Sequence, residues 1–155
     1  MTTSRKTRAR GGSHRLVPRD FSIDARVGHL LRCAYQRASA HLANRLRVHD
    51  LTPVQFAVLM RLWEKGELSQ NQLGRLASMP PGNIHGIVGR LAKRKVIVTR
   101  GEPKDRRLVL ISLSDKGAKL AEELIRLDIE ASRDALAPLE PDEQEIFLKL
   151  LKRMA

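Results

Sequence analysis

Residues 51–113 read LTPVQFAVLMRLWEKGELSQNQLGRLASMPPGNIHGIVGRLAKRKVIVTRGEPKDRRLVLISL. The same helix-start signal, a Ser or Thr followed three residues later by Gln, is present at Thr52–Gln55 and again at Ser69–Gln72. A third start follows the proline pair Pro80–Pro81. The segment therefore predicts three helices close together in the sequence, over about 53–65, 70–77 and 81–95.

The pattern then changes from helical to extended. Aliphatic and β-branched residues form two short runs, 96–99 and 108–113, and the charged segment 101–107 lies between them. This predicts a β-hairpin with a basic tip. Three helices followed by such a hairpin make up a winged helix-turn-helix, in which one helix enters the DNA major groove and the wing reaches the neighbouring backbone. We therefore expect a mainly α-helical fold with a small β-hairpin wing.

Amphipathic helices are predicted on both sides of this segment. Apolar residues at helical spacing predict one long helix from Phe21 to about Val48. Ser114 begins another, to about Leu136, and a last helix ends near Met154. Their apolar faces exceed what one small winged domain can cover, so we expect a homodimer. The expected organisation is a disordered basic arm (1–20), a first dimerisation helix (21–49), a winged DNA-binding domain (50–113) and C-terminal dimerisation helices (114–155).

The charge of the chain favours a polyanionic partner. Its 155 residues include 29 Lys and Arg against 17 Asp and Glu, a formal net charge of +12. Residues 1–113 carry all of this excess, because 114–155 are net acidic. The basic arm is either a solubilising tail or a second DNA contact. No apolar run is long enough for a membrane span, and the basic start lacks the apolar core of a secretory signal, so we expect a cytoplasmic protein without membrane contact.

The third predicted helix has two distinct faces. Its apolar stripe, which should face the core, consists of Ile84, Ile87, Val88 and Leu91. The opposite side presents Gly82, Gly86, Gly89 and Lys93, with His85 and Arg90 on its flanks. Glycine is costly inside a helix, at about 0.5–1 kcal/mol relative to Ala. One interpretation is that bare backbone approaches the groove floor while Asn83, His85 and Arg90 contact bases or phosphates; the other is that the glycines serve no function or make room for a neighbouring side chain.

The hairpin tip carries Lys104, Arg106 and Arg107. Their charge can reach phosphates or a narrow minor groove, whose negative potential attracts Arg. The alternative is a solvated turn without a partner.

Several short matches carry a family resemblance. They are Leu51-Thr52-Pro53, Leu68-Ser69-Gln70, Val88-Gly89-Arg90-Leu91, Asp105-Arg106-Arg107, Ser114 and Gly117. On these residues the chain resembles the MarR family of bacterial regulators from about Phe21 to its C-terminus. The resemblance implies an obligate dimer that binds a pseudo-palindromic double-stranded operator and is often released from it by a small aromatic molecule. It also implies that Asp105 orients the wing arginine, that Arg107 contacts the groove, with Arg106 as the alternative, and that Lys95 stands where members usually have Gly.

The resemblance places an effector pocket where the first, second and fifth helices meet. The candidates there are Tyr35, His41, Phe56, Met60 and Trp63. The aromatic side chains can enclose a ring, and His41 with Arg37 or Arg45 can receive a carboxylate. We expect a small aromatic acid, either a hydroxylated pyridine carboxylate or a benzene carboxylate. The segment from Pro80 to His85 is similar to that of repressors of nicotinate catabolism, which favours the pyridine; the alternative is that these side chains belong to the core.

Two other functions are compatible with parts of the sequence. The single cysteine, Cys33, excludes an intramolecular disulfide framework but can act as an oxidant-sensing thiol if Arg32 and Arg37 lower its pKa. A non-specific architectural DNA-binding protein would need only the charge and the wing. No nucleophile with its base, metal-ligand set or phosphate loop is evident, so we expect neither an enzyme nor a cofactor.

Overall fold

The computed structural model describes residues 21–79, 81–102 and 105–155, with the side chains of 81, 102 and 105–108 left out of the description. The predicted basic arm, residues 1–20, lies outside the described residues. The chain divides into two units, Met1–Ala34 and Tyr35–Ala155, which we describe separately.

The first unit holds a short 3₁₀ helix, η1 (Ile23–Ala25), and the first turns of α1 (Val27–Leu46). A continuous helix from Phe21 is therefore wrong. Arg26 has an extended backbone, with φ −87° and ψ 133°, and separates η1 from α1. Apolar residues at helical spacing are found on both sides of this break. Such spacing indicates which side chains share a face, but it does not show whether the helical hydrogen bonds of the backbone are continuous.

The far end of α1 also differs from its predicted end. The α-helix ends at Leu46, and a 3₁₀ turn, η2 (Arg47–His49), follows it. Asp50 then takes a left-handed backbone conformation, with φ 51°. Arg94 donates hydrogen bonds to the carbonyl oxygens of His49 (2.5 Å) and Asp50 (2.6 Å), so this turn is held by a side chain far along the sequence.

The remaining helices are those that the sequence predicts. They are α2 (Pro53–Lys65), α3 (Gln70–Leu76), α4 (Pro81–Lys93), α5 (Asp115–Leu136) and α6 (Pro141–Met154). The capping boxes at Thr52 and Ser69 are both formed, each with its Gln side chain accepting from the cap's backbone N–H. The Ser114 hydroxyl accepts from the backbone N–H of Gly117 and caps α5. Each such cap contributes about 0.5–2 kcal/mol.

The wing is a three-stranded antiparallel sheet in the order β1-β3-β2, where a two-stranded hairpin was expected. The hairpin strands are β2 (Ile97–Glu102) and β3 (Asp105–Leu113), and the added strand is β1 (Leu68–Ser69). Leu68 pairs with Ile111 and Ser69 with Leu110. A strand of two residues is too short to show an alternation of apolar and polar side chains in the sequence. The hairpin strands extend to the pair Glu102 and Asp105, so they are longer than the two apolar runs in the sequence.

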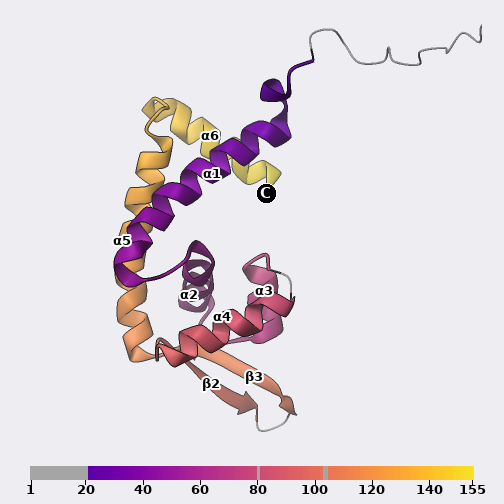
Figure 1. Ribbon diagram of the computed structural model, residues 1–155, viewed down its shortest axis with the longest axis vertical. Coiled ribbons are helices and arrows are strands. Elements are labelled where there is room, and N and C mark those ends of the chain that lie inside the picture. The colour runs from indigo at the N-terminus through magenta and orange to yellow at the C-terminus, as the bar shows by residue number, and fades with distance from the viewer. Residues whose placement is uncertain (1–20, 80, 103–104) are drawn as a thin grey trace, which may run out of the picture. The chain divides into compact units, whose positions relative to one another are not determined.

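One hydrophobic core joins these elements in the second unit. Its fully buried side chains include Leu46 of α1, Leu59 of α2, Leu91 of α4, Ile111 of β3 and Leu124 of α5. Burial of each such side chain contributes about 1.5–3 kcal/mol. Through this core α4 packs beside the hairpin of β2 and β3 (Figure 1).

The end of α4 is fixed to the start of α5. Lys95, between α4 and β2, has φ 58°, the left-handed conformation for which glycine is usual. The Ser114 hydroxyl donates to the Lys95 carbonyl (2.8 Å), and the Ser114 N–H donates to the Val96 carbonyl (3.1 Å). A Cβ atom on Gly117 would lie 1.8 Å from the same Val96 oxygen, so only glycine allows this approach.

No helix among the described residues has both the length and the apolar composition needed to span a membrane.

Candidate nucleic-acid interface and effector pocket

The inner face of α4 is buried as predicted. Ile84, Ile87, Val88 and Leu91 are between 0% and 8% exposed and belong to the core cluster. This burial fixes the rotation of α4 about its axis, so the opposite face must be turned to solvent.

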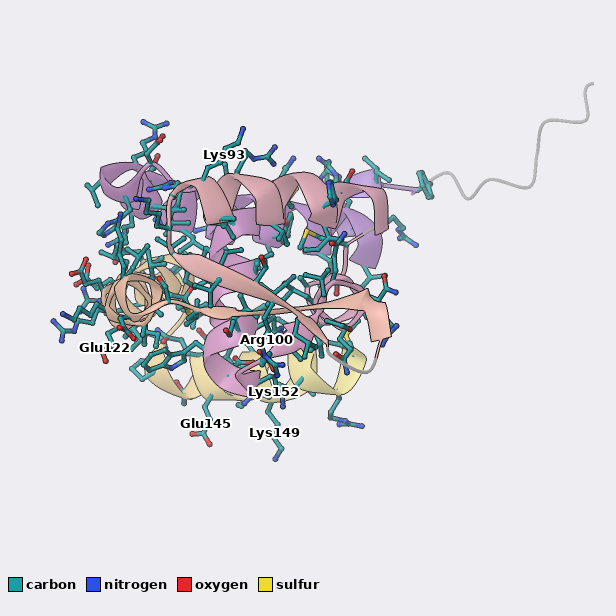
Figure 2. The ribbon with its side chains drawn as sticks, turned by 90° about the horizontal axis from the view of Figure 1, so that it is seen from below. Lys93, Arg100, Glu122, Glu145, Lys149 and Lys152 are labelled. Carbon is teal, nitrogen blue, oxygen red and sulfur yellow. The ribbon has the colours of Figure 1, made fainter. Side chains whose placement is uncertain are left out.

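The outer face of α4 is formed by exposed backbone and a few polar side chains. A Cβ atom on Gly82 or Gly89 would meet nothing within 4 Å, and one on Gly86 would meet only Nη1 of Arg90, at 3.5 Å. Gly82 and Gly89 therefore make room for no neighbour among the described residues, whereas Gly86 lies beside the Arg90 guanidinium. Figure 2 shows Lys93 on the outer side of α4, pointing away from the sheet.

A groove of about 540 Å³ runs along this face. Its lining includes Asn83 and Arg90 of α4 and Thr52 and Val54 at the start of α2. The Arg90 guanidinium lies over Gly86, one turn before it. His85 and Lys93 are exposed but do not line the groove. The structure thus brings two of the four α4 candidates into one groove and leaves the other two at its sides.

The wing candidates can be placed only in part. Lys104 lies outside the described residues, and of Asp105, Arg106 and Arg107 only the backbone is described, in β3. Their predicted contacts therefore remain predictions. At the base of the wing, Arg100 of β2 donates from Nε to Glu67 (2.7 Å), which ties the hairpin to the segment before β1.

A second pocket, of about 360 Å³, lies between α2 and α5. Three of the five effector candidates line it, namely Phe56, Met60 and Trp63 of α2. Tyr35, which is 71% exposed, and the partly buried His41 do not. The remaining lining consists of Ala57, Arg61 and Glu64 of α2 and Ile125, Asp128 and Ile129 of α5.

Asp128 is a pocket residue that the sequence analysis missed. Partial burial disfavours the charged form of its carboxyl group and raises its pKa. A signal was present in the sequence, because Asp128 continues the spacing of the buried residues Gly117, Ala121, Leu124 and Ala131 along one face of α5. An acidic residue on a buried stripe is uncommon and marks either an ion pair or a binding site.

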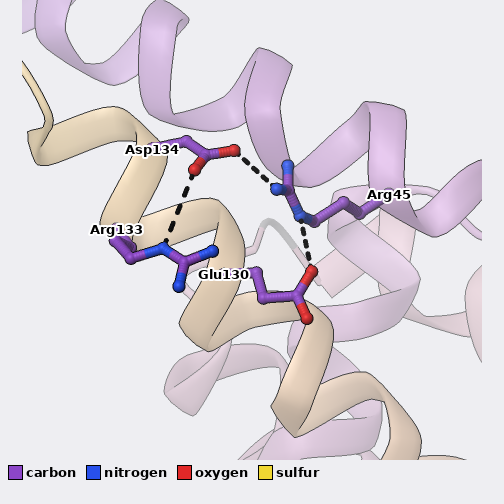
Figure 3. Close-up of polar contacts among 4 residues, drawn as sticks. All are labelled: Arg45, Glu130, Arg133 and Asp134. Carbon is purple, nitrogen blue, oxygen red and sulfur yellow. Dashed lines mark hydrogen bonds and ion pairs between the residues drawn. The ribbon is translucent and has the colours of Figure 1, made fainter.

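Arg45, expected as a possible partner for a ligand carboxylate, already binds two carboxylates of α5. Its Nη2 lies 2.5 Å from Asp134 and its Nε lies 3.4 Å from Glu130 (Figure 3). The hydrogen bond that Arg45 donates to Asp134 raises the pKa of Arg45 above its usual value. These contacts join the end of α1 to α5, so Arg45 acts as a structural link between the two helices.

Cys33 lies in the first unit and is exposed. Its Sγ is 3.4 Å from Nε2 of His29, and the same nitrogen is 3.5 Å from the carboxylate of Asp24. Arg32 contacts the same histidine through Nδ1 (3.2 Å).

Comparison with known proteins identifies the family. Residues 49–108 match the sequence model of the MarR family. The chain is 34% identical over 134 residues to the HTH-type transcriptional repressor NicR of Pseudomonas putida, a match that covers 86% of this chain and 85% of NicR. A probable transcriptional regulator from Pseudomonas aeruginosa is 43% identical and superposes with a TM-score of 0.80 over 86% of this chain and all of that one.

BpsR of Bordetella bronchiseptica, whose DNA binding is regulated by 6-hydroxynicotinic acid, is 31% identical, with a TM-score of 0.79 over 86% of this chain and 96% of BpsR. NicR is a transcriptional repressor, the Pseudomonas aeruginosa protein is a probable transcriptional regulator, and BpsR binds DNA; each of the three matches 86% of this chain. The chain belongs to the MarR family of winged helix-turn-helix, DNA-binding transcription regulators.

Proposed function

We propose that the chain is a homodimeric repressor that binds a pseudo-palindromic operator through α4 and the wing and is released by a small aromatic acid. The observation that carries the DNA-binding part is the outer face of α4, where Asn83 and Arg90 line an open groove above exposed glycine backbone. Side chains of this kind read base edges when a helix lies in the major groove.

The proposed DNA contacts come from two elements, α4 and the wing. Asn83, His85 and Arg90 contact bases or phosphates from α4, and Lys93 adds a phosphate contact. Lys104 and Arg106 bind the backbone from the wing, Arg107 enters the minor groove, and Asp105 orients it. This assignment combines the exposure of the α4 residues with the family resemblance of the wing.

Operator binding is tested by fluorescence anisotropy with duplexes from the promoter next to the gene and with random duplex, over a range of salt concentrations. Lys93→Ala should reduce the salt slope by about 2, because each of the two protomers loses one phosphate contact. Lys149→Ala is the matched control, because it removes the same charge from α6, on the side of the second unit opposite Lys93 in Figure 2. Equal slopes for both variants, or equal affinity for promoter and random DNA, would contradict a sequence-specific interface on α4.

Exposed apolar side chains support the homodimer. In the first unit they include Val27, Leu30 and Leu31. In the second unit they include Ile129, Ile146, Leu148, Leu150 and Met154. Apolar side chains repeated along amphipathic helices usually mark a protein interface. Sedimentation at micromolar concentration should give twice the mass of one chain, and a monomer would contradict the proposal.

The effector part rests on the pocket between α2 and α5. Its volume and its aromatic lining by Phe56 and Trp63 suit a single ring. BpsR provides a relative that responds to a hydroxypyridine carboxylate. Trp63 is the only tryptophan, so binding should change its fluorescence in parallel with DNA release.

A further inference from the structure

The pocket between α2 and α5 contains an acidic group for which the proposed ligand must provide a partner. Its charged lining consists of Arg61 and Glu64 on α2 and Asp128 on α5. Arg61 donates from Nη1 to Glu64 (2.8 Å) and from Nε to the Leu76 carbonyl (3.0 Å). Among the residues that the structure describes, Asp128 has no ion pair. The carboxylate of Asp128 therefore remains available to a ligand.

The surroundings of Asp128 make an incoming hydrogen-bond donor valuable. The carboxylate is partly buried beside Ile125 and Ile129, across the pocket from the aromatic residues of α2. A partly desolvated carboxylate gains more from a donor than a solvated one does, and hydrogen bonds to charged groups contribute about 1.5–3 kcal/mol. A ring that brings only C–H groups to this position leaves the carboxylate desolvated and without a partner.

The two classes of aromatic acid differ at this point. Apart from its hydroxyl and the carboxylate that both classes share, a hydroxybenzoate presents only C–H groups around its ring. A 2-hydroxypyridine in its lactam form carries an N–H on the ring next to a carbonyl oxygen. That N–H is a donor in the ring plane, which is the geometry a carboxylate at the edge of the ring accepts.

We propose that Asp128 accepts a hydrogen bond from the ring N–H of a hydroxypyridine carboxylate and thereby selects it over a hydroxybenzoate of the same shape. The ring lies against Phe56 and Trp63, and the ligand carboxylate faces Arg61, the cation that lines the pocket. This inference rests on the proposed effector function and names the residue that determines its ligand class. A site built around such a hydrogen bond discriminates strongly against an analogue that lacks the donor.

The test compares two acids that differ in one ring position. 6-Hydroxynicotinic acid has a ring nitrogen where 4-hydroxybenzoic acid has a C–H. Each is titrated into the full-length protein and its DNA complex, and Trp63 fluorescence and DNA release are recorded. The wild type should prefer the pyridine by at least about tenfold, which corresponds to 1.4 kcal/mol. Asp128→Leu should reduce this preference to less than about threefold by weakening pyridine binding, without weakening the binding of hydroxybenzoate.

Two further variants make the result decisive. Glu122→Leu is the matched control, because it removes an exposed acid of α5 that does not line the pocket, and it should retain the full preference. Asp128→Asn keeps the size and an acceptor oxygen but loses the charge, so it should show an intermediate preference, and it replaces the Leu variant if circular dichroism shows that variant unfolded. A preference that survives in the Asp128 variants, or equal binding of both acids by the wild type, overturns the role of Asp128 and leaves the effector function intact. A wild type that binds neither acid overturns both.

Discussion

Alanine at the outer glycines of α4 should raise the stability of the protein and lower its affinity for DNA. Gly86 and Gly89 both lie inside the helix, on its solvent-exposed face. A Cβ atom at Gly89 would meet nothing within 4 Å, and one at Gly86 would be in ordinary van der Waals contact with Arg90, at 3.5 Å. In the free protein the two methyl groups therefore cause no clash.

The gain in stability follows from helix propensity. Each glycine inside an exposed helix costs about 0.5–1 kcal/mol relative to Ala, so Gly86→Ala with Gly89→Ala should add about 1–2 kcal/mol to the free energy of unfolding. For a chain of this size 1 kcal/mol shifts Tm by about 2–4 °C, which gives an increase of roughly 2–8 °C.

The loss of DNA affinity has a different origin. If the α4 backbone lies against the floor of the major groove, each added methyl group overpacks a close contact, at a cost of about 1–3 kcal/mol. The two methyl groups of each half-site then cost at least about 2 kcal/mol together, so operator affinity should fall at least about 30-fold, since 1.4 kcal/mol is a factor of ten. The effect on random duplex should be smaller, because non-specific binding relies on phosphate contacts.

Thermal unfolding and operator titration of the same preparations measure both effects. Sedimentation of each variant shows whether its oligomeric state is unchanged. Higher Tm with unchanged operator affinity would refute the close approach of backbone to DNA and leave the glycines without a function. A lower Tm would refute the open outer face itself.

Four other substitutions have defined outcomes. Arg107→Ala should weaken operator binding by at least about 1 kcal/mol and flatten its salt dependence, whereas Arg90→Ala should also alter base preference in a competition assay. Gly117→Ala should cost about 3 kcal/mol or more in urea unfolding, because its Cβ would overlap the Val96 oxygen, 1.8 Å away; wild-type stability would contradict this contact. Asp128→Asn should be more stable than wild type at neutral pH, because burial raises the pKa of Asp128 and the folded state loses stability as pH rises through that pKa; the difference should close in acid.

The sequence predicted those parts of the fold that depend on local signals. Capping residues such as Thr52, Ser69 and Ser114 form their hydrogen bonds within three residues, so their pattern is visible in the chain itself. The apolar stripe of α4 was predicted for the same reason, because a helix of known period places Ile84 and Leu91 on one face.

Features that depend on distant partners were missed or misplaced. Strand β1 exists because β3 supplies its hydrogen bonds, and two residues are too few to show a strand pattern. The turn after α1 is held by Arg94, more than forty residues away. Arg45, which the sequence makes a candidate for ligand binding, instead donates to Glu130 and Asp134. The sequence alone shows that a cationic side chain is present, but it does not show which anionic group pairs with it.

The position of α5 links the proposed ligand pocket to the proposed DNA-binding helix. The start of α5 is held against the end of α4. There Gly117 packs directly against the Val96 carbonyl oxygen, and the Ser114 hydroxyl donates to the Lys95 carbonyl. Its middle lines the pocket through Asp128, and farther along it is bound to α1 by Arg45. A packed core transmits displacement instead of absorbing it. A ligand that moves α5 relative to α2 must therefore break the contact at Gly117 or carry the end of α4 with it. In the proposed dimer the second change alters the spacing between the two copies of α4.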